Sequence, residues 1–259
     1  MPTTPLILGH RGASAVAPEN TLVAFDQAMR DGADGIEFDV RLSRDGVPVV
    51  IHDATLKRTG LSDRLVNQLT AAELSEVDVG SWFARKQPDA QFAGEKLPSL
   101  AQVFTLFGTN TGVLYVEMKC DAGEAAALAS AVVDGIKEFR MTNRVIVASF
   151  DLNAIAEVKS IEAGIRTAAL FEPKLSRPIS TVRSVKMIDT GLDVGADEIA
   201  LHHTLASRRL TEKARREGLD IVVWTVDDPK WITRARSLDI KALITNDPAR
   251  MVQRRDATS

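Results

Sequence analysis

The chain has 259 residues, a formal net charge of −3 and a single cysteine, Cys120. Hydrophobic residues at 45% and charged residues at 26% are ordinary globular values, which excludes a disordered, collagenous or coiled-coil protein. The length suits one large α/β domain or two ordinary domains. Because lysine and arginine are not clustered, charge-driven binding to nucleic acid is disfavoured. One cysteine excludes an internal disulfide and a multi-cysteine metal site.

The first ten residues, MPTTPLILGH, contain neither a basic region nor an apolar stretch of signal-peptide length. No later segment approaches the roughly 18 consecutive apolar residues of a membrane-spanning helix. We therefore expect a cytoplasmic protein with no stable membrane association. The sequence does not indicate its oligomeric state.

Short runs rich in valine and isoleucine alternate along the chain with longer amphipathic stretches. The runs predict strands at Pro5–His10, Asp34–Arg41, Gly112–Lys119, Arg144–Phe150, Ile165–Phe171, Ala196–Ala200, Asp220–Val226 and Lys241–Thr245. The stretches predict helices at Glu19–Asp31, Ser99–Phe107, Gly123–Phe139, Leu152–Ala163, Pro178–Leu192, Ser207–Glu217, Pro229–Ser237 and Pro248–Arg254. This order, with no G-x-G-x-x-G after the first strand, favours a (β/α)8 TIM barrel over a doubly wound sheet.

The segment between the second and third barrel strands is too long for one helical connection. In it, Asp45-Gly46 is a strong signal for a two-residue hairpin turn that leads into a strand at Val47–His52. Residues 53–97 are polar and predict a small helical insertion at the carboxyl end of the second strand, where barrels keep their active sites. Since no linker is evident, we expect residues 1–259 to form one barrel domain that contains this insertion.

Acidic residues lie on the second and third barrel strands. Glu37 and Asp39 are two residues apart, so they share one face of their strand and Phe38 lies on the other. Turned inward, they would repel each other unless a cation lies between them; alternatively, they face solvent or pair with Arg41. Glu117 repeats the pattern on the third strand. Three carboxylates predict one divalent ion, Mg²⁺ or Ca²⁺ in preference to Zn²⁺.

Two histidines are expected beside these acids. A two-residue turn at Asp45-Gly46 would place Asp39 directly opposite His52, on the same face of the hairpin. His10 ends the first strand and reaches the same rim of the barrel. Two histidines that flank a metal–carboxylate cluster make an acid–base pair suited to work near neutral pH.

Arg11 and Lys119 place positive charge at the same strand ends. An arginine binds phosphate through two parallel hydrogen bonds and a lysine binds it as a point charge, although each can also neutralise a neighbouring acid. Together with the acids and histidines, they indicate metal-assisted cleavage of a phosphoester. His202 and His203 have no such context, and we expect them in solvent or at the rim. No Walker motif indicates use of a nucleoside triphosphate.

These residues form motifs that resemble the glycerophosphodiester phosphodiesterase family. The motifs are His10-Arg11-Gly12, Pro18-Glu19-Asn20-Thr21, Glu37-Phe38-Asp39-Val40, DGVPVVIHD over residues 45–53 and Val223-Trp224-Thr225-Val226. The resemblance covers essentially the whole chain. It implies a barrel with a small insertion after the second strand, and a small-molecule substrate, a glycerophosphodiester, which is hydrolysed to sn-glycerol 3-phosphate and an alcohol with a divalent cation.

Motif by motif, the resemblance assigns metal binding to Glu37, Asp39 and Glu117, catalysis to His10 and His52, and phosphate contacts to Arg11 and Lys119. It also implies that Trp224 lines the glycerol or alcohol side and that Glu19 supports the Arg11 loop. Where the family usually has an asparagine after Trp-Thr-Val, this chain has Asp227, to which we assign no role. Attack by a glycerol hydroxyl, which gives a cyclic phosphate, and direct attack by water both fit these residues.

Two alternative functions follow from the same features. A lipid-cleaving barrel, such as a phosphatidylinositol phospholipase C or a sphingomyelinase D, is expected to show an exposed apolar or basic lip. The insertion offers only Trp82, Phe83 and Phe92 among many charges, which disfavours that function. A non-catalytic phosphodiester-binding barrel is expected to lack one of the histidines or acids, and none is missing.

Overall fold

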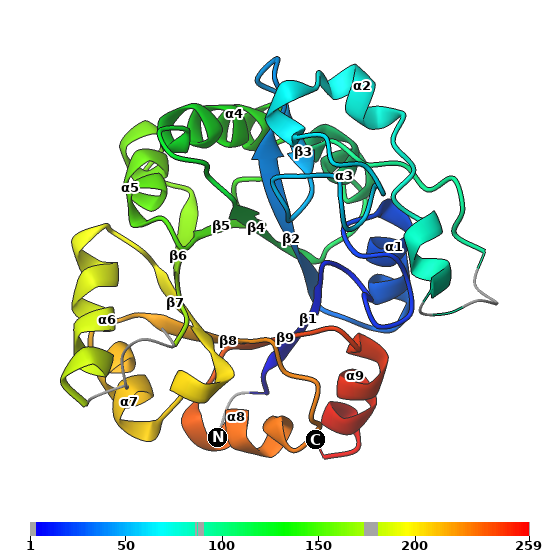
Figure 1. The fold of residues 1–259 in the computed structure, drawn as a ribbon. Helices are drawn as coiled ribbons and strands as arrows, with labels where there is room; N and C mark the ends of the chain where they lie inside the picture. The colour runs from blue at the N-terminus through cyan, green and yellow to red at the C-terminus, as the bar shows by residue number, and fades with distance from the viewer. Residues whose placement is uncertain (1–3, 86, 88–90, 174–180, 259) are drawn as a thin grey trace.

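The structure is a computed structural model that describes residues 4–85, 87, 91–173 and 181–258. Within these ranges, eight parallel strands close into a barrel that helices surround, as Figure 1 shows along the barrel axis. Strand β1 pairs with both β2 and β9, which closes the ring. The barrel strands are β1 (Leu6–His10), β2 (Gly35–Leu42), β4 (Val113–Met118), β5 (Val145–Ser149), β6 (Arg166–Phe171), β7 (Glu198–His202), β8 (Asp220–Trp224) and β9 (Ala242–Thr245).

The predicted (β/α)8 TIM barrel is confirmed, and each predicted strand and helix has a counterpart. The helices outside the insertion are α1 (Leu22–Arg30), α3 (Leu100–Leu106), α4 (Ala125–Glu138), α5 (Leu152–Ile161), α6 (Thr181–Asp193), α7 (Arg208–Arg216), α8 (Trp231–Leu238) and α9 (Pro248–Asp256). The first residues of the predicted helix Pro178–Leu192, residues 178–180, lie outside the described residues. Helix ends follow local chemistry: Thr21 caps α1 by accepting a hydrogen bond from the Ala24 N–H.

The alternation of β2 separates a packing face from a chemical face. Ile36, Phe38 and Val40 are fully buried in a cluster with residues of α1, α3 and α4, such as Phe25. Successive side chains of a strand point to opposite sides, so Glu37 and Asp39 point into the barrel. The sequence thus places three apolar residues against the helices and two carboxylates inside.

The register of the β2–β3 hairpin differs from the prediction. Strand β3 (Pro48–Val50) pairs with β2 so that Val40 lies opposite Val50, and the Ser43 N–H donates to the Val47 carbonyl at 3.0 Å. The loop therefore has three residues, 44–46, and Gly46 takes the left-handed conformation (φ +78°) that closes such loops. The predicted two-residue turn, with Asp39 opposite His52, is wrong by one residue.

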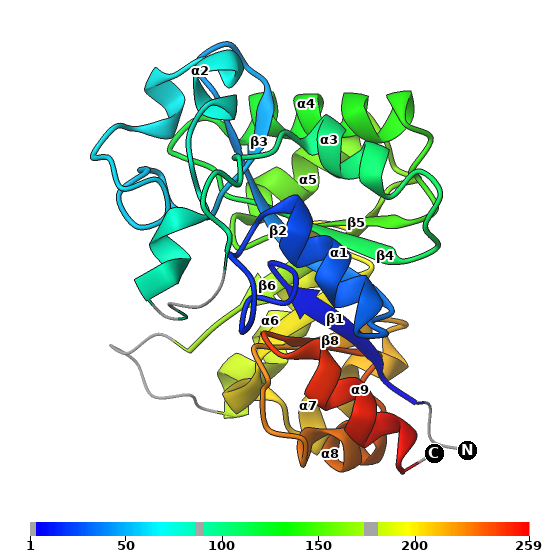
Figure 2. The same ribbon diagram turned by 90° about the vertical axis from the view of Figure 1, so that its right-hand side faces the viewer.

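Residues 53–97 form a small layer with its own core at the carboxyl ends of the strands (Figure 2). It holds helix α2 (Ala71–Ser75) and short 3₁₀ turns at Val66–Gln68 and Ser81–Arg85, while residues 86 and 88–90 lie outside the described residues. Trp82 and Phe83 are buried, so they form no exposed apolar lip. In the part of the chain that the structure describes, no helix is both long and apolar enough to cross a membrane.

Candidate active site

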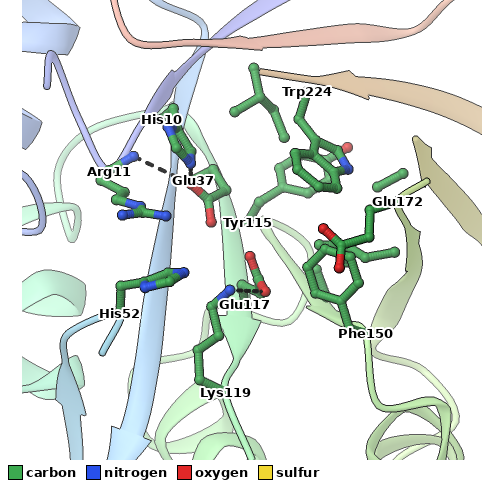
Figure 3. Close-up of a pocket in the computed structure, with 14 residues that line it drawn as sticks. His10, Arg11, Glu37, His52, Tyr115, Glu117, Lys119, Phe150, Glu172 and Trp224 are labelled. Atoms are coloured by element: carbon green, nitrogen blue, oxygen red, sulfur yellow. Dashed lines mark hydrogen bonds and ion pairs between the residues drawn. The ribbon is translucent and has the colours of Figure 1, made fainter. Parts of the chain in front are cut away.

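A cavity of about 480 Å³ opens at the carboxyl ends of the barrel strands. Figure 3 shows its polar half, with side chains from β1, β2, β4 and the segment after β3, facing a half with Phe150 and Trp224. The polar half is formed by His10, Arg11, Glu37, His52, Glu117 and Lys119. All the predicted site residues except Asp39 line this cavity, and Asp39 lies directly behind them, fully buried.

A tight turn after β1 positions Arg11. Its backbone is left-handed (φ +57°), an uncommon conformation for a residue with a side chain, and its N–H donates to the Glu37 carbonyl at 2.7 Å. Gly12 follows at φ +84°, where a Cβ atom would lie 2.5 Å from the backbone of Ala24. Glycine is therefore required at this point, because α1 passes too close for any side chain.

The three predicted acids converge. Asp39 on β2 is the direct partner of Glu117 on β4, and oxygen atoms of Glu37, Asp39 and Glu117 all lie within 4.8 Å of one another. All three residues are buried, and within the described ranges Glu37 Oε1 has no hydrogen-bond partner. A buried carboxylate oxygen without a partner is costly. Three oxygen donors and one unpartnered oxygen fit a hard divalent cation.

The two cations lie against the same acids. Lys119 Nζ is 2.5 Å from Glu117 Oε1 and 3.3 Å from Asp39 Oδ1, and Arg11 Nε is 3.1 Å from Asp39 Oδ2. Arg11 and Lys119 thus neutralise acids, the alternative that the sequence left open. When all three carboxyl groups are ionised, they exceed these two cations by one negative charge. Arg41 instead contacts the His52 carbonyl and Asp121, so the alternative in which Arg41 pairs with Glu37 or Asp39 is wrong.

Burial and neighbouring charges give the three carboxyl groups different pKa values. Burial, and then the charges of Asp39 and Glu117, hold the pKa of Glu37 well above its usual range. Burial and Asp39 raise the pKa of Glu117 to about 7. Burial also acts to raise the pKa of Asp39, but Arg11 and Lys119 outweigh it and the pKa falls below its usual range. Asp39 is therefore the permanently ionised member of the three.

His10 is held by a neutral amide. Its Nδ1 lies 2.7 Å from Asn246 Oδ1, and Asn246 Nδ2 donates to Asp227 Oδ2 at 2.7 Å, which fixes the amide orientation. Nδ1 must then carry the proton, and Nε2, 3.9 Å from Glu37 Oε2, has the lone pair. Burial, and then the charge of Arg11, lower the pKa of His10 to about 4.

His52 is held by a carboxylate. Its Nδ1 lies 2.6 Å from Asp53 Oδ1, so Nδ1 again carries the proton. Arg58 binds both oxygens of Asp53, at 2.7 and 3.1 Å, and also donates to Glu19 at 2.5 Å. Glu19 in turn accepts from Arg11 at 2.7 Å. The expected support of Arg11 by Glu19 is present, and it extends through Arg58 to His52.

Several members of the site were missed at the sequence level. Asn246 follows β9, and a survey of polar residues at every strand end would have included it. Asp227 received no role, yet it orients Asn246. Asn20, within a motif already noted, is buried and donates to Asp39 Oδ2 at 2.9 Å. No local sequence pattern marks Arg58 as a site residue, because the fold of the insertion brings it to Asp53 and Glu19.

The opposite half of the cavity is aromatic. Trp224 ends β8, and its ring meets Phe150 edge to face at 5.4 Å. His202 packs on Trp224 at 5.3 Å, and His203 lies against His202, so both are rim residues as expected. Trp224 Nε1 is buried and has no hydrogen-bond partner among the residues that the structure describes.

Comparisons with known proteins agree with this barrel and site. Residues 10–250 match the model of the glycerophosphoryl diester phosphodiesterase family. The chain is 32% identical over 247 residues to the glycerophosphodiester phosphodiesterase of Caldanaerobacter subterraneus subsp. tengcongensis, covering 95% of this chain and 96% of the relative. The chain therefore belongs to the glycerophosphoryl diester phosphodiesterase family, whose members are phosphoric diester hydrolases.

Solved structures show the same fold. A structure from Silicibacter pomeroyi DSS-3 superposes with a TM-score of 0.87 at 26% identity, covering 100% of this chain and 95% of that one. A phosphodiesterase from Oleispira antarctica, solved with the product sn-glycerol-3-phosphate, superposes with a TM-score of 0.85 at 23% identity, covering 98% of this chain and 97% of that one.

Proposed function

We propose that this chain hydrolyses glycerophosphodiesters to sn-glycerol 3-phosphate and an alcohol, using one divalent cation, Mg²⁺ or Ca²⁺. The observation that carries the proposal is the convergence of the acids Glu37, Asp39 and Glu117 with two histidines in one cavity. Family membership supports the reaction class. The Oleispira antarctica protein, which holds sn-glycerol-3-phosphate, supports a small-molecule substrate of this kind.

Glu37, Asp39 and Glu117 would hold the cation. When bound, it would supply positive charge to the phosphate oxygens on which negative charge builds up. Arg11 and Lys119 lie against the same acids and line the cavity, so they would also bind the phosphate, the arginine through two N–H groups. Trp224 would exclude water from the organic part of the substrate.

The different supports of the two histidines suggest different roles. His10 is neutral at neutral pH because burial disfavours its charged form, and its Nε2 lone pair would take the proton from the attacking hydroxyl. Burial also lowers the pKa of His52, but the Asp39 charge and the hydrogen bond to the Asp53 carboxylate act to raise it. Because a carboxylate rather than a neutral amide holds its Nδ1–H, His52 is the better candidate for the acid, and its Nε2–H would protonate the departing alcohol oxygen as the P–O bond breaks. If a cyclic phosphate forms first, the two histidines exchange roles when water opens it.

We also propose that residues 1–259 act as one domain and that residues 53–97 are an insertion within it. The supporting observation is that the small core of the insertion continues into Val49 and Ile51, just before it. A cytoplasmic location stays a prediction, which cell fractionation would test.

The test of the proposed function is release of sn-glycerol 3-phosphate from glycerophosphodiesters by protein stripped of metal and then supplied with Mg²⁺ or Ca²⁺. We expect activity only after an ion is restored, and none in Glu37→Ala. Full activity after exhaustive chelation would contradict the metal assignment. Absence of phosphate-ester release under every metal would contradict the function itself.

A further inference from the structure

The second half of the cavity contains one acid. Among the described residues that β5 to β9 and the loops after them contribute to the lining, Glu172 alone is ionisable. The others are Ala148, Phe150, Leu170, Ala200, Trp224 and Ile244. In Figure 3 the Glu172 carboxylate points into the cavity from the same side as Phe150 and Trp224. The site proposed above uses Trp224 alone from this half.

Unlike Asp39 and Glu117, Glu172 has no lysine or arginine paired with it among the described residues. Glu117 contacts Lys119 and Asp39 contacts Arg11, whereas Glu172 has no ion pair or hydrogen bond within the described part of the chain. Its side chain is exposed to the cavity mouth, so water can solvate it when no ligand is present. A carboxylate in this position favours a cation in the space beside it.

The neighbouring rings also favour a cation. Trp224 and Phe150 meet edge to face at 87°, and the face of an aromatic ring carries the negative lobe of its quadrupole. Lys119 Nζ already lies 5.4 Å from the Phe150 ring centroid, so this wall accepts an ammonium in the protein itself. Tryptophan provides the strongest such face, and quaternary ammonium ligands are recognised by aromatic walls of this kind.

We propose that this half of the cavity binds a cationic head group, the quaternary ammonium of choline or the ammonium of ethanolamine, with Glu172 and Trp224 setting the preference. The inference rests on the proposed function and deepens it. Such a substrate carries a negative phosphate in its middle, between the glycerol and a positive head group. The cavity offers the matching charges, with Arg11 and Lys119 at one end and Glu172 at the other, and complementarity of this kind gives specificity.

The first test compares substrates that differ only in head-group charge. In Glu172→Gln, we expect the ratio of kcat/KM for glycerophosphocholine to kcat/KM for glycerophosphoinositol to fall about tenfold, which corresponds to ~1.4 kcal/mol. Glu138→Gln is the matched control, because it removes the same charge from an exposed position at the end of α4. Its ratio should equal that of the parent protein.

Two results would overturn the proposal. An equal fall for both substrates would mean that Glu172 contacts the glycerol that they share. An unchanged ratio would mean that it contacts neither.

The second test needs no turnover, so it separates this inference from the proposed function. Calorimetry would compare choline with its neutral isostere 3,3-dimethylbutan-1-ol, both added to the metal-loaded protein. We expect choline to bind more tightly to the parent protein, and this preference to be smaller in Glu172→Gln, in which only the aromatic wall remains. Equal binding of the two compounds to the parent protein would overturn the proposal even if the protein is an active phosphodiesterase.

Discussion

His10 and His52 differ in the group that holds Nδ1, and that difference predicts different responses to the leaving group. An acid is needed most when the departing alcohol is a poor leaving group. We expect His52→Ala to lose roughly 10²–10⁴-fold in kcat on glycerophosphocholine but to recover on a nitrophenyl ester, which needs no proton. His10→Ala should stay inactive on both substrates. Steady-state kinetics with the two substrates would measure this.

The double variant provides the control for this assignment. Since residues that act as a unit are not additive, His10→Ala combined with His52→Ala should lose far less than the product of the two single losses. If neither single variant responds to the leaving group, proton transfer is not their role. Recovery of His10→Ala instead of His52→Ala would reverse the two roles.

The raised pKa values of Glu37 and Glu117 predict that metal binding releases protons. Burial, and then neighbouring negative charge, raise both pKa values, that of Glu117 to about 7, so the metal-free site holds protons near neutral pH. A bound cation requires the ionised forms, so affinity should rise with pH across neutrality. Calorimetry at pH 7 in buffers of different ionisation enthalpy would count the protons released.

Removing one of the proposed metal ligands should stabilise the metal-free protein. Glu37→Gln removes the cost of burying this carboxyl group beside Asp39 and Glu117, so we expect a higher melting temperature without metal and no further rise when Mg²⁺ or Ca²⁺ is added. The parent protein should melt higher with the ion than without it. A Glu37→Gln variant that is still stabilised by the ion would contradict the assignment of Glu37 as a ligand.

The alternation of side chains along a strand was enough to predict where the acids point, but it did not predict the residues that orient the histidines. Glu37 and Asp39 could be placed inside the barrel because side chains alternate along a strand. His52 was predicted in the site through a register that is wrong. It reaches the cavity because regular pairing ends at Val50 and the chain then bends. Asn246 orients His10 across the closed edge of the barrel, a long-range contact that no local pattern encodes.

At the scale of elements, the insertion is joined to the active site through Arg58. Arg58 lies in the insertion and links Asp53, which holds His52, to Glu19, which holds Arg11. We expect Arg58→Gln to lower kcat roughly 10-fold or more, the scale seen when a group that orients a site residue is lost. KM should change less, because Arg58 does not line the cavity.

A neighbouring residue provides the matched control. Lys57→Gln removes the same charge from an exposed side chain whose partner, Asp63, is also exposed, so kcat should stay near that of the parent protein. The pH profile adds a readout that loss of stability would not give. Without Arg58, the Asp53 carboxyl loses the partner that holds its pKa at about 2, so the acid limb of kcat should move to higher pH. An unchanged profile would make Arg58 a structural residue only.

Elements with strong periodicity were predicted well, and the hairpin shows where periodicity ends. Eight strands with near-continuous apolar runs and eight amphipathic helices specify a barrel, because both faces of each strand must be covered. The turn at Asp45-Gly46 depended instead on side chains. Ser43 Oγ donates to Asp45 Oδ1 at 2.6 Å and accepts from the Val47 N–H at 2.9 Å, which stabilises the longer loop. Sequence signals did not distinguish the two loop lengths.

At the scale of the whole molecule, the barrel interior is charged at both ends for different reasons. The carboxyl ends of the strands hold the proposed active site. Toward the amino ends, Glu198 is fully buried; it accepts from Tyr115 Oη at 2.5 Å and from Lys241 Nζ at 2.8 Å, and it pairs with Arg166. Since barrel enzymes keep chemistry at the carboxyl ends, this second network should serve stability.

Glu198→Gln tests whether the network at the amino ends of the strands serves stability. The variant keeps the shape of the side chain but leaves Lys241 and Arg166 with only Asp220, which lies 2.8 Å from Lys241 and 3.5 Å from Arg166. Water can solvate the two cations that remain, because the side chains of Lys241 and Arg166 are 23% and 42% exposed. We therefore expect the free energy of unfolding by urea to fall by about 1.5–3 kcal/mol, the scale of lost hydrogen bonds to a charged group. Asp26→Asn, which breaks a surface pair with Arg30, should cost less than about 1 kcal/mol. Equal losses in the two variants would show that the buried network adds nothing to stability beyond a surface ion pair. The interior charge at the amino ends would then need another explanation, because a fully buried carboxylate is retained only where its partners offset the cost of removing it from water.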